Sequence, residues 1–352
     1  MQNRIHMGFF EPWMERKTRR SEFFKRLTEI VEWDRLEHEI DKIYKKGKSV
    51  DGRPSYPGIM LFKMLLIEIW YDLSDIECEE FVKDSLSAML FLGISLEDSV
   101  PDHSTLSRFR SELAGKKSYD RLLRKINKQL EKQGAKLKKG KTIVDASITI
   151  SPLSPKQSPM YEIAEDRKED ERNTDEINKE NEHHHIIKKE EPGRDNEARW
   201  VKKQNKPLYG YKQTVAVDEK GMIDAVSTTT ANVNDSKTLA VLLSMLPKNR
   251  RAEILADKGF KIPENDELLK SANIKNRIMR KAYRNKKLSY WEIKWNKFIS
   301  KYRYVVERTF GSIKRWFGGY MARYKGLIKM HAQHVLQAIA YNLKRSIGVK
   351  WV

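Results

Sequence analysis

The feature that most constrains the fold is an apolar run that contains a single carboxylate. This run, KTIVDASITI at residues 141–150, is rich in β-branched side chains, and Asp145 stands near its centre. A short run of this composition predicts a buried β-strand. An unpaired charge inside such a strand is costly, so we expect Asp145 to have a partner. That partner is either a hydrogen-bond donor at the end of the strand or a cation.

The chain before this strand is predicted to be helical, from about residue 21 to residue 134. Pro57 opens an apolar helix, Ser74 or Asp75 caps the next one, and a turn at Asp102 precedes a later helix. A run of amphipathic helices of this length predicts a compact, all-helical N-terminal module.

We interpret residues 1–135 as this helical module, with helix-turn-helix character in its last two helices. The helix that follows Asp102 is expected to expose a polar first turn to DNA. Its candidate DNA-binding residues are Ser104, Thr105, Arg108 and Arg110. The alternative is a helical bundle whose polar face meets only water, with Asp102 and Ser104 acting as caps. The sequence leaves both open.

From residue 141 onward the pattern changes to strands alternating with helices. Strands are expected at residues 142–150, 211–218, 222–230, 254–257 and 274–279, the second and third forming a hairpin. Helices are expected at residues 235–246, 289–317 and 331–347. This order predicts a mixed α/β (α+β) layer architecture over residues 136–347. Asp224, in the hairpin, is expected to face solvent.

Residues 151–199 interrupt this pattern. They begin rich in Pro and Ser, and residues 151–200 hold 14 acidic and 9 basic residues. We interpret residues 151–199 as a charged, mobile insertion. His183, His184 and His185 are adjacent on this segment, and adjacent side chains do not converge on one ion, so a metal site is not predicted there.

Two further acids join Asp145 as candidate metal ligands. Asp257 ends a short apolar run, and Glu307 lies in a predicted helix. If the fold brings them together with Asp145, the three carboxylates form a set of hard oxygen ligands suited to Mg²⁺. Taken singly, Asp257 could instead be a turn former and Glu307 part of a surface ladder of salt bridges.

The predicted helix around Glu307 has two distinct sides. Arg303, Glu307 and Lys314 fall on one stripe, within roughly 40° of one another. The other side carries a ridge expected to face the core: Trp295, Ile299, Tyr302, Val306, Thr309, Ile313 and Trp316. The functional interpretation assigns Glu307 to a metal, and Arg303 and Lys314 to DNA phosphates.

The charge distribution indicates a polyanionic partner. The net charge is +20, and residues 271–352 hold 20 Lys and Arg against 2 Asp and Glu. Aromatic residues are interleaved with these cations, which favours a folded basic surface over a disordered arm. A nucleic acid would therefore lie beside Glu307. The single cysteine, Cys78, is expected to be a core residue; with no secretory or membrane-spanning segment visible, we expect a soluble cytoplasmic protein.

Several stretches together resemble bacterial insertion-sequence transposases of the DDE type, in the fifth family of that classification, the InsH-like proteins. They include GRPSYPGIMLFKMLLIEIWYDLSDIECEEF, VPDHSTLSRFR, DASI, ARWVKK, YGYKQTVAVDEKGMIDAVSTTTANVNDSKTL, ADKGF and RYVVERTFGSIKRWFGGYMARYKGL. The resemblance covers most of the chain in the family's order. It implies an RNase H-like catalytic domain whose acidic triad is Asp145, Asp257 and Glu307, preceded by a helical module that binds transposon ends.

The signature around the glutamate in related proteins places a tyrosine, an arginine and a lysine at set distances from it. Here Arg303, Glu307 and Lys314 match, whereas Ser300 stands at the tyrosine position. We therefore expect metal-dependent cleavage of double-stranded DNA followed by strand transfer. Two Mg²⁺ ions, which Mn²⁺ can replace, would be held by the three acids, and the protein would act as a dimer on DNA. The alternatives are an RNase H-like nuclease that does not join strands and a catalytically inactive helix-turn-helix regulator.

Overall fold

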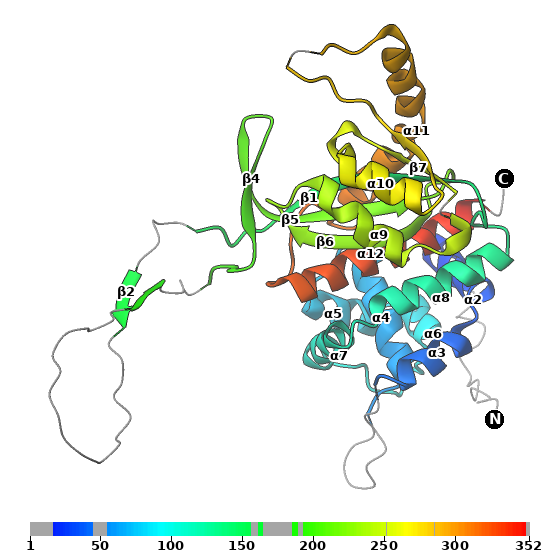
Figure 1. Ribbon diagram of the computed structural model, residues 1–352. Coiled ribbons are helices and arrows are strands. Elements are labelled where there is room, and N and C mark those ends of the chain that lie inside the picture. Colours follow the sequence, from blue (N-terminus) through cyan, green and yellow to red (C-terminus); the bar gives the residue numbers. More distant parts are fainter. Residues whose placement is uncertain are drawn as a thin grey trace, which may run out of the picture.

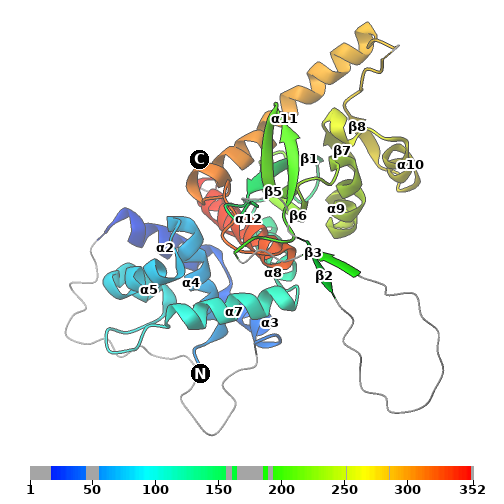
Figure 2. The same ribbon diagram turned by 90° about the vertical axis from the view of Figure 1, so that its left-hand side faces the viewer.

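The computed structural model describes residues 17–44, 55–155, 161–164, 185–188, 193–250, 252–284 and 286–349. In this part of the chain a six-stranded mixed sheet has helices on both faces (Figure 1, Figure 2). The helices of the first 132 residues pack together beyond one of these faces. The mixed α/β architecture and the helical N-terminal region expected from the sequence are therefore confirmed.

The N-terminal helices begin and end where the sequence provides caps. They are α2 (Arg19–Ile30), α3 (Trp33–Asp41), α4 (Gly58–Tyr71), α5 (Asp75–Asp84), α6 (Leu86–Leu92), α7 (His103–Gly115) and α8 (Tyr119–Lys132). Side-chain oxygens of Thr18, Ser74, Ser85 and Asp102 accept hydrogen bonds from first-turn amides of the helices they precede. Apolar residues surround nearly the whole of α4, and this helix is the buried centre of the group.

The sheet is organised around its longest strand. The six strands are β1 (Lys141–Ile150), β4 (Arg199–Lys203), β5 (Lys206–Val217), β6 (Ile223–Thr230), β7 (Glu253–Ala256) and β8 (Lys275–Ile278). Strand β5 pairs antiparallel with β1 on one side, and with β6 and then β4 on the other. Strands β1, β7 and β8 run parallel to one another. The predicted hairpin is β5–β6, and Gly221 at its turn has a φ of +81°.

Helices cover both faces of this sheet (Figure 2). One face packs against α9 (Leu239–Met245), which continues the short helix η1 (Asp235–Thr238), and against α10 (Pro263–Ser271). The other packs against α11 (Tyr290–Trp316) and α12 (Leu327–Val349). Successive side chains of a strand point to opposite faces, so Ile143 belongs to the second core and its neighbour Val144 to the first. Helix α12 begins four residues before the predicted start.

The helical region and the sheet share one continuous core. The indole nitrogen of Trp70 on α4 donates to the carbonyl of Ala340 on α12 at 2.9 Å. The side chain of Asn127 on α8 donates to the carbonyl of Ile223 at 2.9 Å and accepts from Asn342 on α12 at the same distance. The N-terminal helices are therefore fixed to the α/β part by buried hydrogen bonds as well as by apolar contact.

The expectation that Asp224 faces solvent is wrong. Its carboxylate is buried between the ammonium group of Lys136, at 2.5 Å, and the guanidinium group of Arg250, at 3.1 Å. Alternation in a hairpin predicts an exposed face only when one side of the sheet is open. Here β6 is covered by α8 and α12 on one side and by α9 on the other.

The insertion is only partly within the described residues. Two of its segments, β2 (Tyr161–Ala164) and β3 (His185–Lys188), form a separate two-stranded antiparallel sheet. The stretches that contain His183 and His184 lie outside the described residues. The sequence-based interpretation of residues 151–199 as an insertion therefore stays a prediction.

Two expectations drawn from composition concern the single cysteine, Cys78, and the absence of a membrane-spanning segment. Cys78 is fully buried in the helical core, and burial raises the pKa of its thiol, as expected for an inert core residue. Within the described ranges, we find no helix that is both long enough and apolar enough to cross a membrane.

His334 on α12 makes the stability of the fold depend on pH. Its fully buried ring bonds the hydroxyl of Thr149 at 3.0 Å and that of Thr228 at 2.8 Å. Burial, followed by the charge of His331, lowers its pKa from 6.5 to about 3. Between these two values the unfolded chain binds a proton that the folded protein excludes, so the folded state loses stability as the pH falls.

We expect protonation of His334 in the unfolded chain to lower the free energy of unfolding by up to about 1.4 kcal/mol for each pH unit below pH 6.5. Urea unfolding at pH 7, 6 and 5 measures this slope. The variant His334→Gln retains a donor and an acceptor but cannot titrate. A slope as steep in the variant as in the parent would show that His334 does not cause it.

Candidate active site

Asp145 and Asp257 lie side by side because their strands are parallel neighbours. Val144 on β1 is in register with Ala256 on β7, and each aspartate is the next residue along its strand. Asp145 accepts a hydrogen bond from the amide of Ala146 at 2.9 Å, and its side chain is 15% exposed. Asp257 caps the short helix η3 (Lys258–Phe260) and accepts from the amide of Lys258 at 2.6 Å. The sheet thus places both carboxylates at one end of β7.

Glu307 reaches the same place from a helix. Helix α11 packs against β1 and β7, and it presents Arg303 and Glu307 one turn apart on the side that carries the predicted stripe. The Glu307 side chain is 59% exposed, so one side of the cluster is open to solvent. A ligand can therefore approach the three carboxylates from the Glu307 side.

One guanidinium group joins all three acids. Nitrogen atoms of Arg303 lie 3.1 Å from an oxygen of Asp145, 3.7 Å from Asp257 and 3.5 Å from Glu307. Burial raises the pKa of the Asp145 carboxyl, and the positive charge of Arg303 opposes that shift. Burial also opposes the charge of Arg303, yet Asp145 and Asp257 raise its pKa above the ordinary value. The site therefore stabilises a cation among three carboxylates.

The chemistry of this group of side chains fits a divalent cation. All three acids offer hard oxygen donors, and Asp145 is held in a desolvated position where a positive partner is favourable. Among the described residues, no three His, Cys, Asp or Glu side chains are spaced to coordinate an ion directly. The carboxylates instead surround the Arg303 guanidinium, so direct coordination requires Arg303 to move out from among them.

The remainder of α11 agrees with the predicted stripe and ridge except at one residue. Ile299, Val306, Thr309 and Ile313 are buried, and Trp295 and Tyr302 are partly buried, whereas Trp316, the last residue of the helix, is 53% exposed. Lys314 is half-buried, and both burial and the nearby charge of Lys203 lower its pKa. Lys203, which follows the insertion and is more than 100 residues from Lys314, was not among the predicted site residues.

Four residues near the start of α7 were expected to be exposed, and two of them are. Ser104 and Arg108 are exposed and Thr105 is half-buried. Asp102 accepts from the hydroxyl of Ser104 at 2.6 Å and from the amide of Thr105 at 2.8 Å, as a cap does. Arg108 donates to both hydroxyl groups, at 3.3 and 3.2 Å.

The expectation that Arg110 is exposed is wrong. Its side chain is 6% exposed and lies 2.6 Å from Glu68, with a second ion pair to Asp75. Because α7 packs onto α4 and α5, the helix face that carries Arg110 is turned inward. Arg110 therefore joins three helices within the protein and is not available to a phosphate at the surface.

Comparison with known proteins identifies the family of this chain. Residues 11–112 match the family Transposase domain (DUF772), and residues 182–343 match the family Transposase DDE domain. The transposase for insertion sequence element IS1106 of Neisseria meningitidis serogroup B is 36% identical over 240 residues, covering 68% of this chain and 76% of that protein. No solved structure matches the chain.

These matches define the class of protein as a metal-dependent enzyme that acts on DNA. The chain belongs to the insertion-sequence transposases of the DDE type. It is a DNA transposase, as the resemblance in the sequence implied, and DNA is its substrate.

Proposed function

We propose that Asp145, Asp257 and Glu307 are the ligands of two Mg²⁺ ions, for which Mn²⁺ can substitute, and that they form the catalytic site for DNA strand cleavage and strand transfer. The observation that carries this proposal is the position of Arg303, whose guanidinium group lies 3.1 to 3.7 Å from all three carboxylates. Three acids from two strands and a helix share one cationic partner. A pair of divalent cations is a stronger partner for the same oxygens.

In this proposal each side chain has a distinct role. The three carboxylates hold the cations, and the hydrogen bond from the Ala146 amide fixes the orientation of Asp145. Bound divalent cations would activate the attacking oxygen and stabilise the leaving oxygen of an in-line displacement. Arg303 exchanges its carboxylate contacts for a phosphate oxygen, and Lys314 holds a neighbouring phosphate. Helix geometry places Lys314 about 10 Å beyond Glu307, a length of roughly three base pairs.

The order of the strands also supports an assignment of the whole catalytic domain. An antiparallel group of three strands (β6, β5 and β1) continued by two parallel strands (β7 and β8), with carboxylates on β1, directly after β7 and on α11, is consistent with an RNase H-like catalytic domain over residues 136–347. Residues 1–135 would contribute to end binding through Ser104, Thr105 and Arg108. Because two transposon ends must be brought together, we expect a homodimer on double-stranded DNA, at the bacterial nucleoid.

The proposed reaction is tested on a supercoiled plasmid that carries both ends of the element. With Mg²⁺ or Mn²⁺ the full chain is expected to cut at the ends and join them to a target, and EDTA or Ca²⁺ alone should give no product. Products are resolved on denaturing gels and joints are sequenced. Cleavage without any joined product would favour the nuclease alternative, and binding without cleavage in Mg²⁺ would favour the inactive regulator.

A further inference from the structure

A basic ribbon extends from the sheet beyond the C-terminal end of β1, the strand that carries Asp145. Strand β4 and the first residues of β5 form a hairpin, called here the β4–β5 ribbon (residues 199–207), which stands clear of the helices (Figure 1). Gln204 and Asn205 form its two-residue turn with φ values of 48° and 62°, as a twisted two-stranded ribbon requires. All of its side chains are exposed except that of Val201, which is half-buried.

The charges of the ribbon have one sign. Arg199, Lys202, Lys203 and Lys206 are its only ionisable residues, and it contains no acid. Lys203 and Lys206 are directly opposite each other in the strand register, where like charges destabilise a β-ladder. Alternation along β4 places Lys202 on the face opposite to Lys203. Both faces of the ribbon therefore carry cations, and a polyanion would remove their repulsion.

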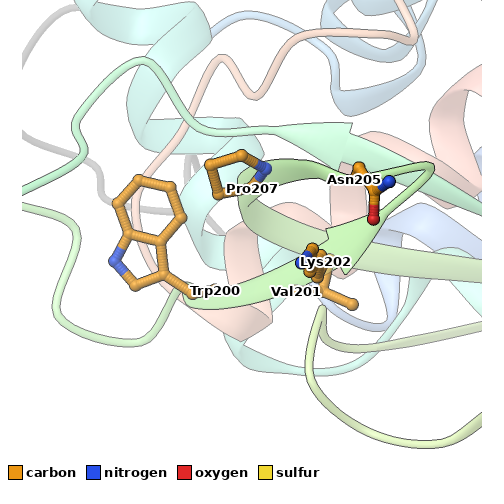
Figure 3. A pocket seen from close by; sticks show the side chains of 5 residues that line it. All are labelled: Trp200, Val201, Lys202, Asn205 and Pro207. Atoms are coloured by element: carbon orange, nitrogen blue, oxygen red, sulfur yellow. The ribbon is translucent and has the colours of Figure 1, made fainter.

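The ribbon also carries an exposed aromatic surface. Trp200 is 48% exposed, and its ring lies 5.1 Å from that of Tyr209 on the neighbouring strand. A shallow pocket of about 430 Å³ lies here, and it is lined by Trp200, Val201, Lys202, Asn205 and Pro207 (Figure 3). In this view the indole extends to one side of the strand. A flat apolar ring among cations is suited to a nucleic-acid sugar or base.

A cation of the ribbon interacts electrostatically with the helix that carries Glu307. After burial, the positive charge of Lys203 contributes to the lowered pKa of Lys314, so the ribbon lies within electrostatic range of the C-terminal part of α11. Lys314 follows Glu307 by about 10 Å along the same helix. A line of cations thus leads from the carboxylates, through Lys314, to the ribbon, as a DNA backbone crossing the site would need.

We propose that the β4–β5 ribbon is a DNA-binding arm that enters a groove of the duplex beside the scissile phosphate, with cations on both of its faces contacting the two phosphate walls and Trp200 contacting a sugar or base. The width of the major groove, about 12 Å, admits a two-stranded ribbon. This proposal rests on the proposed function, since it takes DNA to cross the three carboxylates. It adds a binding element that lies outside the acidic cluster.

The test measures DNA affinity as a function of NaCl concentration. Fluorescence anisotropy of the full chain with a labelled duplex that ends in the element's terminal sequence is recorded between 50 and 200 mM NaCl, with EDTA present. We expect the triple variant Lys202→Ala, Lys203→Ala, Lys206→Ala to lower the slope of log K against log salt by roughly 2 to 3, since each phosphate contact contributes about 0.9. Trp200→Ala should weaken binding about fivefold or more with an unchanged slope.

The matched control removes the same amount of charge elsewhere. Arg124, Lys128 and Lys132 are exposed on α8, and their triple alanine variant should keep most of the slope. An equal loss of slope in both triple variants, or an unchanged slope in the ribbon variant, would overturn the ribbon assignment, and an unchanged affinity of Trp200→Ala would overturn the aromatic contact. If the parent protein gave no cleavage product in Mg²⁺ while the ribbon variant still lowered the salt slope, the proposed function would fail and the ribbon assignment would stand, so the two failures are distinguishable.

Discussion

The variant Asp145→Asn is expected to lose DNA strand cleavage by about a hundredfold to a thousandfold or more, the scale found when one preorganised electrostatic group is removed. Asparagine keeps the shape of the side chain but removes the negative charge that would bind a cation. Folding should change by only about 1 kcal/mol, because the loss of attraction to Arg303 is offset by the smaller cost of burying a neutral group. DNA affinity should persist, since the variant is more positive by one charge. Plasmid cleavage in Mg²⁺ and anisotropy on the same preparation measure both properties.

A suitable control is Glu253→Gln. Glu253 lies at the start of β7, is 16% exposed against 15% for Asp145, and pairs with one arginine, Arg277, at 2.7 Å. It stands at the other end of the strand from Asp257, so its substitution should leave cleavage within a few-fold of the parent. If Asp145→Asn cleaved as well as Glu253→Gln, the assignment of Asp145 as a metal ligand would be refuted.

Replacement of Arg110 by methionine is expected to destabilise the protein by about 3 to 5 kcal/mol, the range found when one partner of a buried ion pair is removed. Arg110 lies 2.6 Å from Glu68, whose side chain is 2% exposed, and it also pairs with Asp75. Burial raises the pKa of Glu68, and Arg110 opposes that shift. Without Arg110 the Glu68 carboxyl must bind a proton or depend on Arg323, which lies 3.2 Å away. Urea unfolding at pH 7 gives the change in free energy.

Two comparisons make this result specific to the buried pair. Arg108→Ala removes an exposed arginine from the same helix and should cost less than about 1 kcal/mol. The double variant Arg110→Met, Glu68→Gln no longer has an unpaired buried charge and should recover part of the loss. If the variants at Arg108 and Arg110 lost the same stability, the network around Glu68 would not hold α4, α5 and α7 together.

This network also connects distant parts of the chain. Glu68 on α4 accepts from Arg110 on α7, and from Arg323 and Tyr324 in the segment before α12. The first and last thirds of the chain thus meet at one buried carboxylate. A substitution at Arg110 therefore affects the packing of the helical region against the α/β part, even though it lies outside the acidic cluster.

Much of the fold could be predicted from the sequence because its signals are local. The β-branched run that contains Asp145 is β1, the hairpin is β5–β6, and the caps at Ser74 and Asp102 are where the side chains suggested. Burial on both faces of the hairpin could not be predicted in the same way. Whether Asp224 meets water or two buried cations depends on helices far away in the chain.

The candidate active site shows the same distinction between local features, which could be predicted, and contacts between distant residues, which could not. The three acids and the stripe of Arg303 and Lys314 were predicted from residue type, spacing and resemblance. The sequence did not show that one guanidinium group joins the three carboxylates, nor that Lys203 approaches Lys314. Arg110 was misassigned because an arginine on a polar helix turn has the same local pattern whether that turn faces DNA or another helix.

The sequence by itself determined which segments become strands and helices, where the carboxylates stand along them, and the family to which the chain belongs. Only the tertiary structure decided which charged groups meet: Arg303 with three acids, Arg110 with Glu68, and the ribbon with the end of α11. The physical reason is that secondary structure follows from interactions within a few residues. Electrostatic partners are instead set by the register of parallel strands and by helix packing across 100 residues or more.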